Sequence, residues 1–334
     1  MIRKLSALFI AVSLATAAFA AAPFEMTRGD IKLVLYPDSG SFSLYKLSDI
    51  GKNRYEPLFE DRDASATSWF SVSVNGRIFK LAPKMGKPVA FAETKDGAKF
   101  VFTLSDDFQV EQEFSFTTTA LSGASPMVLI ETRIENTSGK SGSFALKAML
   151  DTSLGERAAS HFRTDIRNRI SAETRFVSGV DRDSWILSKN GTLALAFLRA
   201  GPDITAPDTV YIANWDRLNS MTWLPDFAEG RSFNTIYSIN DSAVLVVWHD
   251  KELRAKEKMS GRMMLGSWNG SAGESAAKLA VDPKKIRMGD YREAAIKDLL
   301  DRIAAIESDP DSVSEEELIR LNAELDSMLG QTGD

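Results

Sequence analysis

The chain has 334 residues, no cysteine and a formal net charge of −6, from 46 acidic and 40 basic residues. It is long enough to bury a large core without disulfides, and its acidic balance argues against nucleic acid as a partner. The missing cysteines also exclude a thiolate nucleophile, a cysteine zinc site and a lipoprotein anchor.

The first 20 residues have the pattern of a secretory signal peptide. A basic head at Arg3 and Lys4 precedes an apolar run from Leu5 to Phe19, and Ala18-Phe-Ala20 matches an A-x-A cleavage site. We expect cleavage after Ala20, which leaves a mature chain with a net charge of −8, located in the periplasm or secreted. No later stretch has the length and apolar character of a transmembrane segment.

Residues 21–285 have the pattern of one large β domain. Short alternating runs are separated by turn residues, and two of the turns, at Asn75-Gly76 and at Lys189-Asn-Gly-Thr192, predict β-hairpins. The alternation in Phe108–Phe116 predicts one face on a core and one in water. The expected strands are Ile31–Tyr36, Ser41–Tyr45, Trp69–Val74, Lys99–Leu104, Phe108–Thr117, Met127–Glu135, Ser143–Leu150, Thr192–Arg199, Thr209–Trp215, Phe233–Ile239, Ala243–His249 and Ser260–Trp268.

This many strands, without alternating long helices, predicts a mainly β fold. We expect a large antiparallel two-sheet super-sandwich, because the strands outnumber those of one small sandwich.

Residues 286–334 predict a C-terminal α-helical hairpin. Asp290 with Glu293 and Ser314 with Glu317 have capping-box spacing, so each pair is expected to open a helix. The apolar stripes of the two helices are Ala295, Leu299, Ile303 and Ile306, and Leu318, Leu321, Leu325 and Leu329. Such a hairpin packs either on its own β domain or on a partner or second copy. Leu299, Ile303, Leu318, Leu321 and Leu325 are the candidate partner-binding residues.

Few residues have the arrangement of a catalytic centre. The two histidines are His161, in a polar loop, and His249, at a strand end. Asp151 and Glu156 share one loop and could form an acid–base pair or bind calcium, as could Asp181 and Asp183. A solvated acidic turn also explains each pair, so the sequence predicts no metal site and no cofactor.

Tryptophans are frequent in the second half of the β region. Trp215 and Trp223 lie in an irregular polar stretch, where exposed rings could stack on sugars or buried rings could pin the loop. These two are the candidate ligand-binding residues.

Three segments resemble large β proteins of the galactose-mutarotase-like super-sandwich type. They are Arg133–Lys140 leading through Phe144 to the loop Leu150-Asp-Thr-Ser-Leu-Gly-Glu156, then Asn214–Asn219, then Ser238–Trp248. The resemblance covers most of residues 21–268 and implies that fold and the handling of carbohydrate. Mutarotases use a histidine and a glutamate over the sugar ring, and no such pair is matched here.

Two functions follow as hypotheses. The first is a non-enzymatic envelope protein, a β scaffold whose helical hairpin binds a partner or a second copy. The second is a carbohydrate-binding or carbohydrate-active protein, with Asp151, Glu156 and His161 near a groove at Trp215 and Trp223. The second requires these side chains to converge in space.

Overall fold

The computed structural model describes residues 22–60, 67–84, 89–119, 126–156, 158, 160–191, 193–220 and 222–267. The expected signal peptide and the expected C-terminal hairpin, with Leu299, Ile303, Leu318, Leu321 and Leu325, lie outside the described residues. Among the described residues, no helix has the length and hydropathy that a bilayer span requires.

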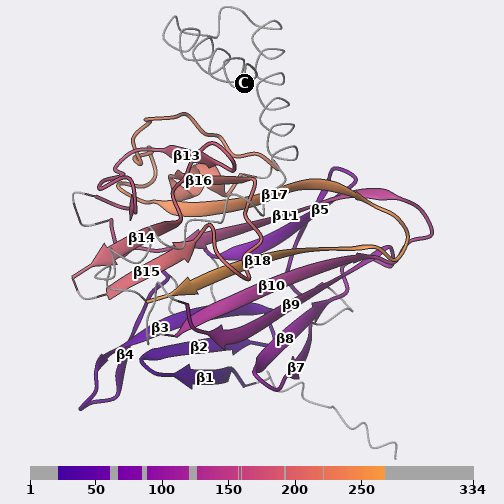
Figure 1. The fold of residues 1–334 in the computed structure, drawn as a ribbon, viewed down its shortest axis with the longest axis horizontal. Coiled ribbons are helices and arrows are strands. Elements are labelled where there is room, and N and C mark those ends of the chain that lie inside the picture. The colour runs from indigo at the N-terminus through magenta and orange to yellow at the C-terminus, as the bar shows by residue number, and fades with distance from the viewer. Residues whose placement is uncertain are drawn as a thin grey trace, which may run out of the picture.

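The described strands form three antiparallel sheets (Figure 1). The four-stranded sheet follows chain order: β1 (Phe24–Arg28), β2 (Ile31–Tyr36), β3 (Ser41–Asp49) and β4 (Arg54–Pro57). The eight-stranded sheet has the order β12 (Arg163–Thr164), β14 (Trp185–Asn190), β15 (Leu193–Leu198), β18 (Lys258–Gly266), β10 (Met127–Asn136), β9 (Phe108–Thr117), β8 (Gly97–Phe102), β7 (Ala90–Glu93). The six-stranded sheet has the order β13 (Thr174–Val177), β16 (Thr209–Ala213), β17 (Ala243–Leu253), β11 (Gly142–Asp151), β5 (Trp69–Val74), β6 (Arg77–Lys80).

The fold is therefore mainly β, as predicted, but a third, small sheet accompanies the two large ones. Its strands β1 and β4 are short and largely polar, so their alternation is too weak to predict from sequence. The one helix among the described residues is α1 (Trp215–Leu218), a single turn.

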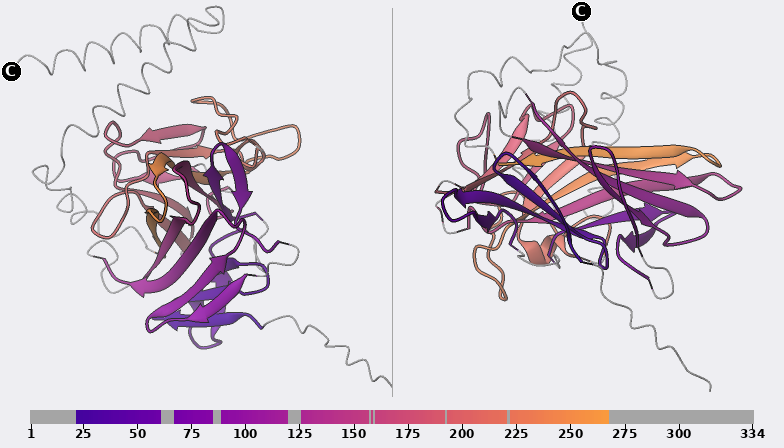
Figure 2. Two further views of the ribbon diagram at one scale, coloured as in Figure 1. Left: turned by 90° about the vertical axis from the view of Figure 1, so that its right-hand side faces the viewer. Right: turned by 90° about the horizontal axis from the view of Figure 1, so that it is seen from below.

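One hydrophobic core joins all three sheets. Phe42 of β3 has its ring centroid 6.2 Å from that of Phe70 in β5 and 5.2 Å from that of Phe114 in β9. Each fully buried aromatic side chain of this kind stabilises the fold by about 1.5–3 kcal/mol. In Figures 1 and 2, β1 and β2 lie at one end of the molecule and residues 214–242 lie at the other.

Local sequence signals explain most of the strands. Phe108, Val110 and Phe114 of β9 are buried as the alternation predicts. Asn75 and Gly76 have φ angles of 51° and 79° in the turn between β5 and β6, which confirms the first hairpin. β14 and β15 form the second.

The strand expected at Phe233–Ile239 is wrong. The Thr235 hydroxyl accepts the backbone N–H of Tyr237 (3.1 Å) and of Ser238 (2.9 Å), which turns the chain. Ile236, Tyr237 and Ile239 are each more than 80 % exposed, and Phe233 is buried. Local hydroxyl hydrogen bonds therefore override the alternating pattern.

Candidate functional site

The segment 214–242, which we name the cover, connects β16 to β17, and its described residues (214–220 and 222–242) pack on the six-stranded sheet. They pack on the face turned away from the main core, where Met149, Tyr211 and Leu245 form a second apolar cluster. The half-buried rings of Trp215 and Trp223 contact this cluster. Two irregular tryptophan-bearing turns thus cover one face of a sheet.

Asn214 holds the two ends of the cover together. Its side chain is fully buried, caps α1 by accepting the N–H of Asp216, and donates to the carbonyls of Phe233 (2.6 Å) and Asp241 (3.2 Å). The strand expected to reach Trp215 therefore ends at Ala213, because Asn214 starts a helical turn instead.

Glu173 anchors the middle of the cover. Its carboxylate has no exposed surface and accepts from Arg217, from Arg231 Nε (3.1 Å) and from the N–H of Ala228 (3.0 Å). Arg217 also donates to the Asn234 carbonyl (2.7 Å). A single buried carboxylate thus holds the helical turn at Arg217 and the turn from Ala228 to Arg231.

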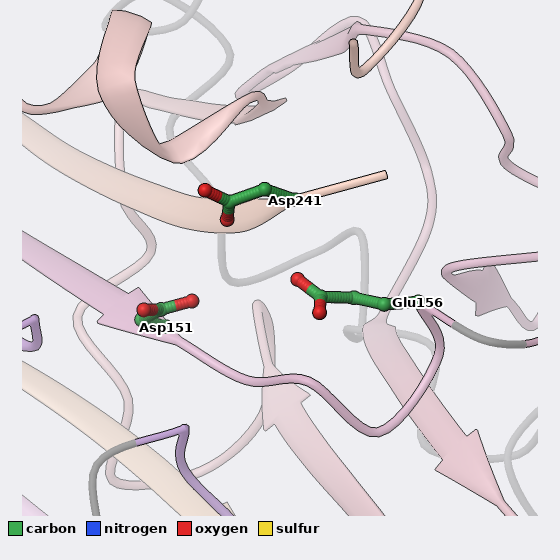
Figure 3. A group of neighbouring side chains, drawn as sticks. All are labelled: Asp151, Glu156 and Asp241. Carbon is green, nitrogen blue, oxygen red and sulfur yellow. The ribbon is translucent and has the colours of Figure 1, made fainter. Parts of the chain in front are cut away.

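Three carboxylates meet where the cover returns to the sheet (Figure 3). Asp151 ends β11, Glu156 follows in the next loop, and Asp241 precedes β17. One carboxylate oxygen of each lies within 4.8 Å of the others. The register places Asp151 opposite Ala243, which brings Asp241 to the same end of the sheet. We name these three residues the acidic cluster.

Asp151 is the most buried member, at 3 % exposed. Burial raises its pKa to about 8, and the negative charges of Asp241, Glu156 and Glu60 add to the shift. Burial and the nearby Asp216 carboxylate raise the pKa of Asp241 as well. Among the described residues, no lysine or arginine forms an ion pair with Asp151 or Asp241.

A histidine and a glutamate meet at Ser242, beside the cluster. Glu156 Oε1 accepts the Ser242 N–H (3.0 Å), and His161 Nδ1 lies 2.7 Å from the Ser242 hydroxyl. Burial lowers the pKa of His161, whose ring packs 4.6 Å from that of Phe233. The sequence candidates Asp151, Glu156 and His161 therefore lie in one neighbourhood.

Gly155 permits this close approach. A Cβ on this residue would lie 2.0 Å from the His161 carbonyl oxygen, a contact that no side chain can make without moving the backbone. The glycine therefore lets the loop that carries Glu156 lie against the chain at His161.

The two candidate tryptophans lie on the sheet face that carries Asp151, but they contact different residues there. Trp215 Nε1 donates to the carbonyl of Thr67 (2.9 Å), the residue whose hydroxyl adjoins Asp151. Trp223 lies further along β11, over Lys147, whose Nζ is 5.0 Å from the ring centroid. Trp215 thus borders the acidic cluster, whereas Trp223 closes over a buried lysine.

Lys147 is a structural anchor for the cover. It is 1 % exposed, and its Nζ donates to the carbonyls of Thr222 (3.0 Å) and Trp223 (3.3 Å) between the rings of Trp69 and Trp223. Burial lowers its pKa to about 8. The amine is therefore held by backbone carbonyls of the cover and by two aromatic rings.

The other candidates from sequence have structural partners. Asp181 forms an ion pair with Arg167, and Asp183 accepts from the Thr164 hydroxyl. His249 is exposed on β17, with Nε2 3.4 Å from the Thr209 hydroxyl. None of them lies in the acidic cluster.

Sequence reasoning missed Asp241 and Tyr237. Asp241 lies 85 positions after Glu156 in a turn, and only the pairing of β11 with β17 brings the two together. Tyr237 is 86 % exposed, whereas its alternating sequence pattern predicts a strand. Its loop is held by the Ser238 hydroxyl, which donates to Asp216 Oδ2 (3.1 Å).

No protein-family model matches this chain, and no curated protein sequence does. Several solved structures resemble it at low identity. A putative aldose 1-epimerase from Escherichia coli K12 has a TM-score of 0.43 and 10 % identity over 74 % of this chain and 98 % of its own. A galactose mutarotase-like protein from Lactobacillus casei has a TM-score of 0.45 and 9 % identity over 74 % of this chain and 100 % of its own.

A polysaccharide lyase also resembles the chain, with a TM-score of 0.43 and 12 % identity over 74 % of this chain. The match spans 34 % of that longer protein. The aldose 1-epimerase and the galactose mutarotase-like protein bear names of the type that the three sequence segments resemble.

Proposed function

We propose that the protein is an exported carbohydrate-binding protein whose binding site is the acidic cluster together with the loop that carries Tyr237. The observation that supports this most directly is that one loop carries both the exposed Tyr237 and, four residues later, Asp241 of the acidic cluster. Sugars are bound by such a combination, because hydroxyl groups donate to carboxylates while the apolar face of the ring packs on an aromatic side chain.

The loop at Tyr237 is well ordered for such a role. Asn240 N–H donates to Asn234 Oδ1 (2.8 Å), and the Thr235 and Ser238 hydroxyls both donate to Asp216 Oδ2. A loop held in this way loses little conformational entropy when a ligand binds. Asp241, the next acid along the chain, is a member of the acidic cluster.

Replacing Tyr237 by alanine should weaken glycan binding about tenfold, the effect of losing roughly 1.4 kcal/mol of ring contact. The mature chain, residues 21–334, would first be screened on a glycan array, and the best ligand would then be titrated by calorimetry. Ile236→Ala is the matched control, since Ile236 is 89 % exposed in the same loop and cannot stack as an aromatic ring does. Equal affinities of Tyr237→Ala and the unaltered chain would contradict the proposal.

A second candidate function is proton transfer on the bound sugar. It is favoured by Glu156 and His161, which reach the same serine and could act as base and acid. Polarimetry, which measures how fast the two anomers of an aldose interconvert, separates the two functions when it is applied to the sugars that bind. A catalysed rate that Glu156→Gln abolishes would favour the enzyme, and an uncatalysed rate with intact binding would favour a binding protein.

The partner-binding hypothesis for the C-terminal hairpin remains a separate proposal. It rests on the capping boxes and leucine stripes of residues 290–334, which lie outside the described residues. Truncation after Gly289 should remove an envelope partner, or self-association, from cross-linked complexes that the full mature chain retains. Identical complexes for both chains would contradict this role.

A further inference from the structure

The acidic cluster poses an electrostatic problem that the described side chains do not resolve. Three carboxylates have oxygens within 4.8 Å of one another, and Glu60 and Asp216 add negative charge nearby. Carboxylates at this separation repel one another strongly in a partly buried site. Protons or a cation must therefore offset the charge.

Two buried oxygen atoms at the cluster also lack partners. Among the described residues, neither Asp151 Oδ1 nor the Thr67 hydroxyl has a hydrogen bond of normal geometry, although the two side chains adjoin each other. Unpartnered buried polar atoms are rare in folded proteins, because each costs about 1–3 kcal/mol. Asp151 is 3 % exposed, and its Oδ1 atom is therefore a buried oxygen that is available to a cation.

We infer that Asp151, Glu156 and Asp241 bind a calcium ion, with Thr67 Oγ1 as a further oxygen ligand. All four of these side chains offer oxygen ligands, which suits a hard divalent cation. Calcium takes oxygen ligands at 2.3–2.6 Å, so ligands on opposite sides of the ion lie about 4.6–5.2 Å apart. The limit of 4.8 Å on the oxygen separations meets this requirement, and flexible carboxylates suit calcium better than the strict octahedron of magnesium.

The three acids come from different parts of the chain. Asp151 ends β11, Glu156 lies in the following loop, and Asp241 lies in the cover two residues before β17 (Figure 3). A cation at this point would tie the cover to the six-stranded sheet and fix the base of the Tyr237 loop. This inference shares its carboxylates with the proposed glycan site but is tested separately, because it requires calcium to bind when no glycan is present.

Calorimetric titration of the metal-free mature chain with calcium chloride tests the inference. We expect one ion per chain, and a midpoint of thermal unfolding about 5 °C higher at saturating calcium than in EDTA. Asp241→Asn and Glu156→Gln should each weaken calcium binding at least about tenfold, because each removes one ligand charge. Glutamine keeps the carbonyl that accepts the Ser242 N–H, so the loop should stay in place.

Asp250→Asn is the matched control, with the same loss of charge on an exposed residue towards the other end of β17. It should bind calcium as the unaltered chain does. The inference would be overturned if the unaltered chain bound no calcium at millimolar concentration, which would leave protonation as the sole means of offsetting the charge. Binding by Asp241→Asn and Glu156→Gln as tight as that of the unaltered chain would also overturn it, and equal affinity for magnesium would overturn the choice of calcium.

Discussion

Glu173→Ala should lower the free energy of unfolding by about 3 kcal/mol, the largest effect that we expect from any single residue that anchors the cover. The substitution removes the carboxylate that binds Arg217 and Arg231, and it leaves the Ala228 N–H without its acceptor. Breaking a buried ion pair costs about 3–5 kcal/mol, and the partial exposure of both arginines places this case at the lower end. Urea unfolding followed by circular dichroism measures the change.

Asp226→Asn is the control for this prediction. Asp226 also forms an ion pair with Arg231, but its side chain is 68 % exposed. Its loss should change stability by no more than about 0.5 kcal/mol. If Glu173→Ala cost less than about 1 kcal/mol, the cover would be held by its apolar contacts and not by Glu173.

Asp151→Asn should stabilise the calcium-free protein by about 2–4 kcal/mol at pH 8, with no advantage at pH 4. The pKa of Asp151 is raised in the folded state from 3.8 to about 8, so the folded protein binds this proton more tightly than the unfolded chain does. The free energy of unfolding therefore falls as the pH rises from about 4 to 8. The groups that face Asp151 and raise its pKa are Asp241, Glu156 and Glu60.

Denaturant unfolding in EDTA, repeated from pH 4 to pH 8, measures this difference. The two proteins should have equal stability at the acid end and diverge as the pH rises. In saturating calcium the difference should shrink, since the asparagine variant loses a charged ligand and is stabilised less by the ion. A difference between the two proteins that does not depend on pH would contradict the account of Asp151.

The β class and most individual strands follow from local sequence. The alternation in β9 and the Asn75-Gly76 turn need no tertiary information, because side-chain period and turn chemistry decide them. The loop at Thr235 is different, because a hydroxyl that bonds neighbouring N–H groups competes with strand pairing. The alternation of Phe233, Thr235 and Tyr237 could not reveal this competition.

Only part of the candidate site could be predicted from local sequence, because its third acid is brought in by long-range strand pairing. Asp151, Glu156 and His161 lie within eleven residues of one another, so a shared loop suggests their proximity. Asp241 joins them through the register of β11 with β17, a long-range pairing that no local pattern specifies. Knowledge of that register, with the turn Asn240-Asp241-Ser242 directly before β17, would have located the third acid.

Hydrogen–deuterium exchange of the mature chain, with and without its best-binding glycan, tests the central claim most directly. The claim is that the acidic cluster and the Tyr237 loop form one ligand site, so the account predicts slower exchange in residues 151–161 and 234–242. A cavity of about 230 Å³ lined by Trp69, Lys80 and Gln112 lies elsewhere in the fold. Protection confined to residues 68–83 around that cavity, with none at 234–242, would contradict the account.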